Sequence, residues 1–99
     1  SGPTHVLLTG RAHALGAGPL VLGTDPGPGR GLVISGSQPG ISRRHCTLER
    51  RDGEVVVRDH SRFGTFLNGT RVAGTAVLAP GDRLRLVTPG VVLELVAVD

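Results

Sequence analysis

The sequence predicts an all-β domain, an antiparallel β-sandwich, from three observations. Apolar residues come in short runs, and none of these runs shows convincing helical spacing. Turn-forming residues recur about every 8–12 positions, which is typical of short strands that fold back on one another. The segment Asp25–Gly31 (DPGPGRG) cannot be helical, because it holds two prolines and three glycines.

Three short strands are expected in the first half of the chain. They are Thr4–Thr9, Leu20–Leu22 and Leu32–Ile34, each an apolar run that ends at glycine or a polar residue. Residues 12–18 (AHALGAG) are small, and we expect them to form a flexible loop. Residues 35–40 (SGSQPG) are expected to form a second loop.

The second half predicts paired strands joined by tight turns. In the strand that follows His45, Cys46 and Leu48 share one face, while Thr47 and Glu49 share the other. The inward-facing Cys46 is expected to be a small core residue. Three dipeptides that favour reversals then join neighbouring strands: Asp52-Gly53, Asn68-Gly69 and Pro89-Gly90.

The composition fits one small globular domain that recognises an anionic partner. The chain has 99 residues, of which 38% are hydrophobic, and its net charge is +3. Ser1-Gly2 is typical of what remains after tag removal, so we take 3–99 as the domain. All 11 basic residues are arginines. Guanidinium groups pair with phosphate in a planar two-pronged geometry, so an arginine-rich composition favours an anionic partner.

Several other function classes are not expected. The two aromatic residues, Phe63 and Phe66, are too few for the stacking platforms of single-strand nucleic-acid binders. There is no apolar run long enough to span a membrane. The single cysteine excludes an intrachain disulfide and a cysteine-based zinc site, which favours a reducing, cytoplasmic location. Asp59-His60-Ser61 is not expected to form a catalytic triad, since adjacent residues on extended chain point in different directions.

The most informative motifs lie in the middle of the chain. Ser42 and His45 form a Ser-x-x-His turn, and Ser61, Gly64-Thr65 and Asn68-Gly69 follow in order. This pattern resembles the forkhead-associated (FHA) family. The resemblance implies an FHA/SMAD-like sandwich of about eleven strands whose loops bind a phosphothreonine-bearing protein segment in Ser/Thr kinase signalling. It also implies a monomeric adaptor within a longer chain, with no cofactor, metal, membrane or nucleic acid and no catalysis.

The resemblance assigns a role to each motif residue. Ser42 is expected to donate a hydrogen bond to the phosphate, with Arg43 and Arg62 beside it. A phosphothreonine carries about −1.5 to −2 charge and three acceptor oxygens, so hydroxyl and guanidinium donors suit it. The residues expected to support the site, rather than contact the partner, are His45, which joins two loops, together with Gly64 and Asn68.

Two positions depart from the family pattern. Thr24 stands where the family has its main phosphate-binding arginine, and Phe63 stands where it has an asparagine that holds the peptide backbone. Arg30 is expected to replace the missing arginine, either by reaching back from an extended loop or because Gly29-Arg30 is itself the motif. Phe63 offers an apolar platform for a partner side chain. Two hypotheses therefore stay open: a phosphothreonine-dependent adaptor, and a phosphate-independent protein-binding sandwich.

Overall fold

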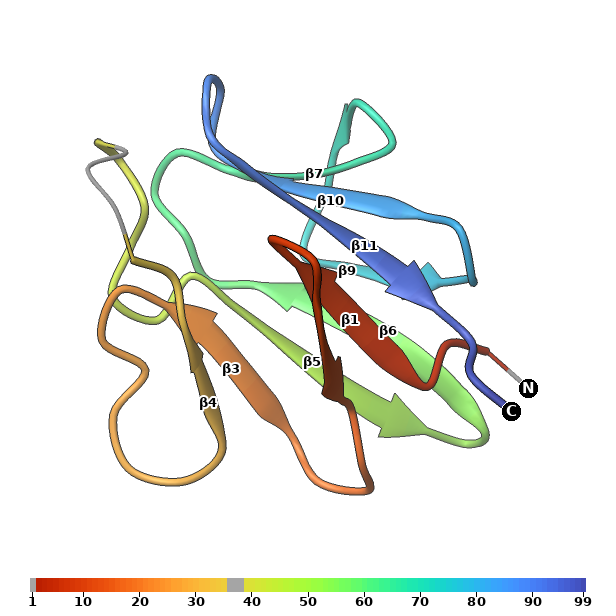
Figure 1. Ribbon diagram of the computed structural model, residues 1–99. Helices are drawn as coiled ribbons and strands as arrows, with labels where there is room; N and C mark the ends of the chain where they lie inside the picture. Colours follow the sequence, from red (N-terminus) through yellow and green to blue (C-terminus); the bar gives the residue numbers. More distant parts are fainter. Residues whose placement is uncertain (1, 36–38) are drawn as a thin grey trace.

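A computed structural model describes residues 2–35 and 39–99, and it places eleven strands in two facing sheets, with no helix among these residues (Figure 1). One sheet has the order β2-β1-β11-β10-β7-β8, and the other has the order β4-β3-β5-β6-β9. The predicted all-β sandwich is confirmed. The strands are β1 His5–Leu8, β2 Arg11–Ala14, β3 Leu20–Gly23, β4 Gly31–Val33, β5 Cys46–Arg51, β6 Glu54–Asp59, β7 Thr65–Leu67, β8 Thr70–Arg71, β9 Thr75–Leu78, β10 Arg83–Leu86 and β11 Val91–Val96.

The core lies between the two sheets. Leu84 of β10 lies opposite Leu93 of β11, and Leu22 of β3 lies opposite Cys46 of β5. All four side chains are fully buried. Burying a leucine side chain contributes about 1.5–3 kcal/mol, so this layer is the main source of rigidity for the loops at the ends of the strands.

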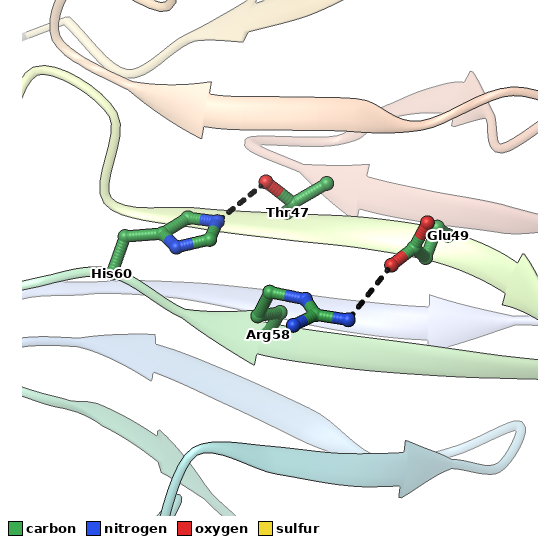
Figure 2. A network of polar contacts seen from close by, with 4 residues as sticks. All are labelled: Thr47, Glu49, Arg58 and His60. Atoms are coloured by element: carbon green, nitrogen blue, oxygen red, sulfur yellow. Dashed lines mark hydrogen bonds and ion pairs between the residues drawn. The ribbon is translucent and has the colours of Figure 1, made fainter.

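The strand β5 alternates as predicted. Cys46 and Leu48 are buried, while Thr47 and Glu49 point to the outer face of the sheet. There Thr47 Oγ1 lies 2.9 Å from His60 Nε2, and Glu49 Oε1 lies 3.6 Å from Arg58 Nη2 (Figure 2). These exposed cross-strand contacts contribute modestly to stability, because solvent screens them.

The predicted hairpins at Asp52-Gly53, Asn68-Gly69 and Pro89-Gly90 are confirmed, since each joins two paired antiparallel strands. Asp52 and Asn68 adopt left-handed backbone conformations, with φ of 52° and 50°. Tight hairpin turns require this conformation, and Asn and Asp tolerate it better than most residues.

Two features of the first half differ from expectation. Residues 12–18 were expected to form a flexible loop, but Arg11–Ala14 forms β2 and pairs with β1. The prediction failed because β2 is an edge strand that buries little, so it carries no apolar alternation. The strands β3 and β4 pair in parallel, whereas the other strand pairs within residues 2–35 and 39–99 are antiparallel. Of the loop predicted at 35–40, residues 36–38 lie outside the described part.

The strand β9 carries no sequence signal of its own. Thr75–Leu78 pairs with β6 at the edge of the five-stranded sheet, and only Leu78 is buried. The other inward-facing residue, Ala76, is small and only partly buried, so the segment gives little evidence of a period of two.

The sandwich brings four strand ends to one rim. The C-terminal ends of β3 and β6 meet the N-terminal ends of β5 and β7, because Leu22 is paired with Cys46, and Cys46 with Asp59. The connecting loops gather at the left of Figure 1, and both chain termini lie at the right. No helix long and apolar enough to cross a membrane occurs in residues 2–35 or 39–99.

Candidate functional site

The rim is held together first by its backbone. The Thr24 N–H donates to Ser42 O at 3.2 Å, and the Asp25 N–H donates to Arg43 O at 3.1 Å. Gly23 makes this approach possible, because a Cβ atom at this position would lie 1.8 Å from the Arg43 carbonyl oxygen. The end of β3 and the turn that begins with Ser42 are therefore packed backbone against backbone.

His45 joins this turn to the loop between β6 and β7. Its side chain is fully buried; Nδ1 accepts the Ser42 N–H at 3.1 Å, and Nε2–H donates to Gly64 O at 2.8 Å. The bond accepted at Nδ1 requires the neutral ring, because a protonated Nδ1 cannot accept. Burial lowers the pKa of His45 below its ordinary value, although the Gly64 hydrogen bond and the Asp59 carboxylate act in the opposite direction. His45 thus fixes the spacing of the two loops.

Asp59 organises the second loop from inside. Its Oδ1 accepts the Ser61 N–H at 3.0 Å, the Ser61 hydroxyl at 2.6 Å and the Thr65 hydroxyl at 2.9 Å. The Ser61 Oγ in turn accepts the Gly64 N–H at 2.9 Å. Burial alone would raise the pKa of Asp59, but the hydrogen bonds from Ser61 and Thr65 and the nearby His45 outweigh it, so the pKa is lowered.

Ser42 and Arg62 face each other across the rim. The Arg62 N–H donates to Ser42 Oγ at 3.4 Å. Ser42 is half-buried, and the side chains of Arg62 and Arg43 are exposed. Since the Ser42 oxygen acts as the acceptor here, its own O–H remains able to donate. A hydroxyl donor on a stiff turn, in a rim whose loops carry two exposed arginines, is an arrangement suited to an oxyanion.

Arg30 does not reach this rim. Its guanidinium donates to Leu15 O at 2.6 Å and to Ala14 O at 2.7 Å, and its own carbonyl accepts the Val21 N–H at the opposite end of β3. Both routes by which Arg30 was expected to replace the missing arginine therefore lack geometric support. Thr24 does lie at the rim, where its side chain is exposed and uncharged.

Beside the rim lies an apolar groove with a volume of about 340 Å³. Phe63 is 55% exposed there, and the Arg62 guanidinium carbon lies 5.4 Å from the centre of its ring, a cation–π contact. The residues that line the groove come from several loops and strands: Pro39, Gly40, Phe63, Phe66, Val87 and Thr88.

The two remaining predicted residues have different positions. Gly64 lies under the rim with φ of 105°, and a Cβ atom there would lie 3.0 Å from the Phe66 ring and 3.1 Å from Arg71 Nε. Asn68 lies at the far end of β7. Its side chain bonds the Asp82 carboxylate and the Arg83 N–H, each at 2.9 Å, so it steadies the hairpin away from the rim.

Sequence reasoning missed two residues of the site. Asp59 organises the loop, and an Asp followed two residues later by Ser is a signal for such a local turn. Arg71 of β8 also contacts the loop, where its Nη2 lies 3.5 Å from Arg62 O. No local signal identifies Arg71, because its position depends on the pairing of β7 with β8.

Neither a triad nor a metal cluster is formed by the described residues. His60 contacts Thr47 on the outer face of the sheet (Figure 2). Ser61 instead bonds Asp59. Residues 2–35 and 39–99 contain no group of three or more His, Cys, Asp or Glu side chains placed to hold a metal ion. Burial raises the pKa of the Cys46 thiol to about 12, which leaves it unreactive at neutral pH.

These features together define a rim of connected loops at one end of a two-sheet β-sandwich. The FHA domain family matches residues 20–87, the segment that holds every element of the rim. The chain therefore belongs to the FHA domain family. No curated protein matches it.

Solved structures agree with this assignment. The FHA-1 domain of Rv1747 from Mycobacterium tuberculosis is 26% identical, with 97% of this chain and 99% of that chain covered and a TM-score of 0.73. A domain from a structural and functional analysis of phosphothreonine-dependent FHA domain interactions is also 26% identical, with 96% and 95% covered and a TM-score of 0.73. The MEK1 FHA domain in complex with the HOP1 pThr318 peptide shares the fold at 23% identity, with both chains fully covered and a TM-score of 0.79.

Proposed function

We propose that this FHA domain binds a phosphothreonine-bearing segment of a partner protein, as a cytoplasmic adaptor in Ser/Thr kinase signalling. The observation that carries the proposal is the Ser42 hydroxyl. It lies on a turn that is tied to the neighbouring loop and accepts the Arg62 backbone N–H, and both Arg62 and the next residue in the chain, Arg43, are exposed. A similar domain is described in work on phosphothreonine-dependent FHA domain interactions.

The partner residues next to the phosphothreonine would lie over Phe63. Phenylalanine cannot bond a peptide backbone through its side chain, but the groove beside it is apolar and open to solvent. An aliphatic partner side chain in this groove would bury apolar area, which contributes about 25 cal/mol per Å². Apolar contact would thus take over part of the role that backbone hydrogen bonds have in the family pattern.

A phosphate-independent interaction domain is the second candidate function. It is favoured by Thr24 at the position of the family arginine and by the engagement of Arg30 at the other end of β3. The two candidates share the groove and differ only in whether phosphate contributes to affinity.

One titration separates them. A single peptide is prepared with phosphothreonine, with phosphoserine and unmodified, and its affinity is measured by fluorescence anisotropy. We expect the phosphothreonine form to bind most tightly and Ser42→Ala to weaken it by about 1–2 kcal/mol, roughly 5- to 30-fold. Thr70→Ala, which removes an exposed hydroxyl at the β7–β8 turn, is the matched control. Equal affinity for all three forms would establish the phosphate-independent function instead.

A further inference from the structure

A row of alternating charge and apolar surface crosses the outer face of the six-stranded sheet. Phe66 of β7 lies directly opposite Arg71 of β8 on one side and Arg85 of β10 on the other, and Arg85 lies opposite Val92 of β11. Directly paired residues of antiparallel strands share a face, so the four side chains form one continuous row. Arg71 is exposed, and Val92 is 50% exposed.

The arginines of this row are positioned by aromatic rings and by polar contacts. The Arg85 guanidinium carbon lies 5.0 Å from the centre of the Phe66 ring, and Arg85 Nε donates to Thr88 Oγ1 at 3.1 Å. Arg71 contacts the carbonyl of Arg62, whose own guanidinium lies over Phe63. Both rings and Thr88 line the apolar groove, so the row begins where the groove ends.

The guanidinium groups of Arg62, Arg71 and Arg85 have no carboxylate partner among the described residues. Within residues 2–35 and 39–99, the one ion pair closer than 4 Å joins Arg58 to Glu49 on the other sheet. On the outer face of the six-stranded sheet, Glu94 lies opposite Arg83 and not opposite Arg85. A surface with several arginines and no described carboxylate within 4 Å of them favours an anionic ligand.

We propose that the Arg71–Phe66–Arg85 row is a second anion site, which binds a carboxylate or a second phosphate on the same partner segment that carries the phosphothreonine. The segment would cross the groove as an extended chain, at about 3.3 Å per residue, before its anionic side chain meets the row. The site therefore selects partners in which acidic or phosphorylated side chains lie close to the phosphothreonine. This inference rests on the proposed phosphopeptide function.

The test varies the two anions independently. Peptides carry threonine or phosphothreonine at the centre, and alanine, glutamate or phosphoserine at one position from five residues before to five residues after it. Affinities are measured by anisotropy at low and at high salt for the native domain, Arg71→Gln, Arg85→Gln and the double variant. Arg51→Gln is the matched control, because Arg51 is an exposed arginine beside the β5–β6 turn. Thermal unfolding checks that every variant is folded.

We expect at least one position at which glutamate or phosphoserine raises affinity about threefold to tenfold. The gain should be lost in Arg71→Gln or Arg85→Gln, kept in Arg51→Gln and reduced at high salt. A gain with glutamate identifies a carboxylate site, and a gain with phosphoserine alone identifies a phosphate site.

Two results would overturn the second site. One is the absence of any gain that the Arg71 and Arg85 variants remove. The other is that a single-stranded RNA oligonucleotide binds the domain, that this binding depends on both Arg71 and Arg85, and that none of the peptides displaces the RNA. Failure of the proposed function is seen separately, as equal affinity for the alanine peptides with and without the phosphate on threonine.

Discussion

Replacing His45 by alanine tests how the rim is built. The imidazole is fully buried and makes two hydrogen bonds, one from the Ser42 N–H and one to the Gly64 carbonyl. Alanine removes both bonds and leaves a cavity between the loops. Both side-chain hydrogen bonds of His45 go to residues of the rim, so the change in unfolding free energy reports on the rim itself.

The expected loss of stability follows from the groups left behind. The Ser42 N–H loses its partner, and leaving a partly buried donor unsatisfied costs about 1–3 kcal/mol. The Gly64 carbonyl keeps the Val87 N–H at 3.1 Å, so it loses one of two hydrogen bonds, which costs about 0.5–1.5 kcal/mol. With the lost packing of the ring, we expect the free energy of unfolding to fall by about 2–4 kcal/mol. For a domain of this size that lowers Tm by about 10–25 °C.

The assay is denaturant unfolding followed by circular dichroism, together with phosphopeptide titration of the folded fraction. His60→Ala is the matched control, because His60 is an exposed histidine with one hydrogen bond to Thr47, and its loss should change stability by less than about 0.5 kcal/mol (Figure 2). If His45→Ala costs no more than His60→Ala, His45 does not hold the two loops together.

The same histidine predicts a dependence of stability on pH. Its pKa in the folded domain is lower than the ordinary value of 6.5, so the unfolded chain binds its proton first as the pH falls. The stabilisation is therefore complete above pH 6.5 and is lost progressively below it. In His45→Ala this part of the loss between pH 7.5 and 5.5 should disappear, whereas His60→Ala should retain it.

Three further predictions concern neighbouring residues. Asp59→Asn should lower the free energy of unfolding by about 1–3 kcal/mol at pH 7, because the carboxylate accepts three hydrogen bonds; an unchanged denaturation midpoint would argue against this role. The stability of the native protein should also fall as the pH drops below 3.8, because the pKa of Asp59 is lowered in the folded domain and the unfolded chain takes up the proton first. Gly23→Ala should lower the free energy of unfolding by at least about 1–3 kcal/mol and weaken phosphopeptide binding, because the added Cβ meets the Arg43 carbonyl. Gly18→Ala is the control in the same unfolding assay, because a Cβ added there has no atom within 4 Å. Cys46 should not react with a disulfide reagent at pH 8 until the domain unfolds, because its pKa is about 12, and rapid labelling of the native protein would contradict its burial.

The sequence predicts the parts of this fold that rest on local chemistry. Asp52-Gly53 and Asn68-Gly69 predict hairpins because left-handed turns need such residues, and the alternation around Cys46 predicts which face is buried. The strand Arg11–Ala14 escaped prediction because its place is set by its partner and not by its own side chains. Strands at sheet edges carry little apolar signal, so only the three-dimensional pairing reveals them.

In the candidate site, too, the residues set by local sequence could be predicted, and those placed by strand pairing could not. The Ser-x-x-His turn predicts Ser42 and His45, since their roles depend on a short stretch of chain. The expectation for Arg30 rested on the length of a loop, and the loop runs back along β3 and places Arg30 at its other end. Arg71 reaches the rim only through the pairing of β8 with β7, which no spacing in the sequence predicts.

At position 24 the charge of the rim can be changed without removing a backbone hydrogen bond. The Thr24 N–H bonds the Ser42 carbonyl, so the backbone of this position is engaged whatever side chain it carries, and that side chain is exposed. Thr24→Arg should therefore fold normally and add a guanidinium to the rim. The adjacent Asp25 opposes a phosphate, so we expect the low end of a charge-assisted bond, about 1.5 kcal/mol.

That figure corresponds to about a tenfold gain in affinity for the phosphothreonine peptide, with no gain for the unmodified one. The measurement is the ratio of the two affinities in Thr24→Arg and in the native domain, with Thr24→Gln as the uncharged control of similar length. If the ratio does not rise, position 24 does not face the phosphate. The anion would then have to be bound from the other side of the rim, where Arg62 and Arg71 lie, so Arg62→Gln should abolish the preference for phosphate.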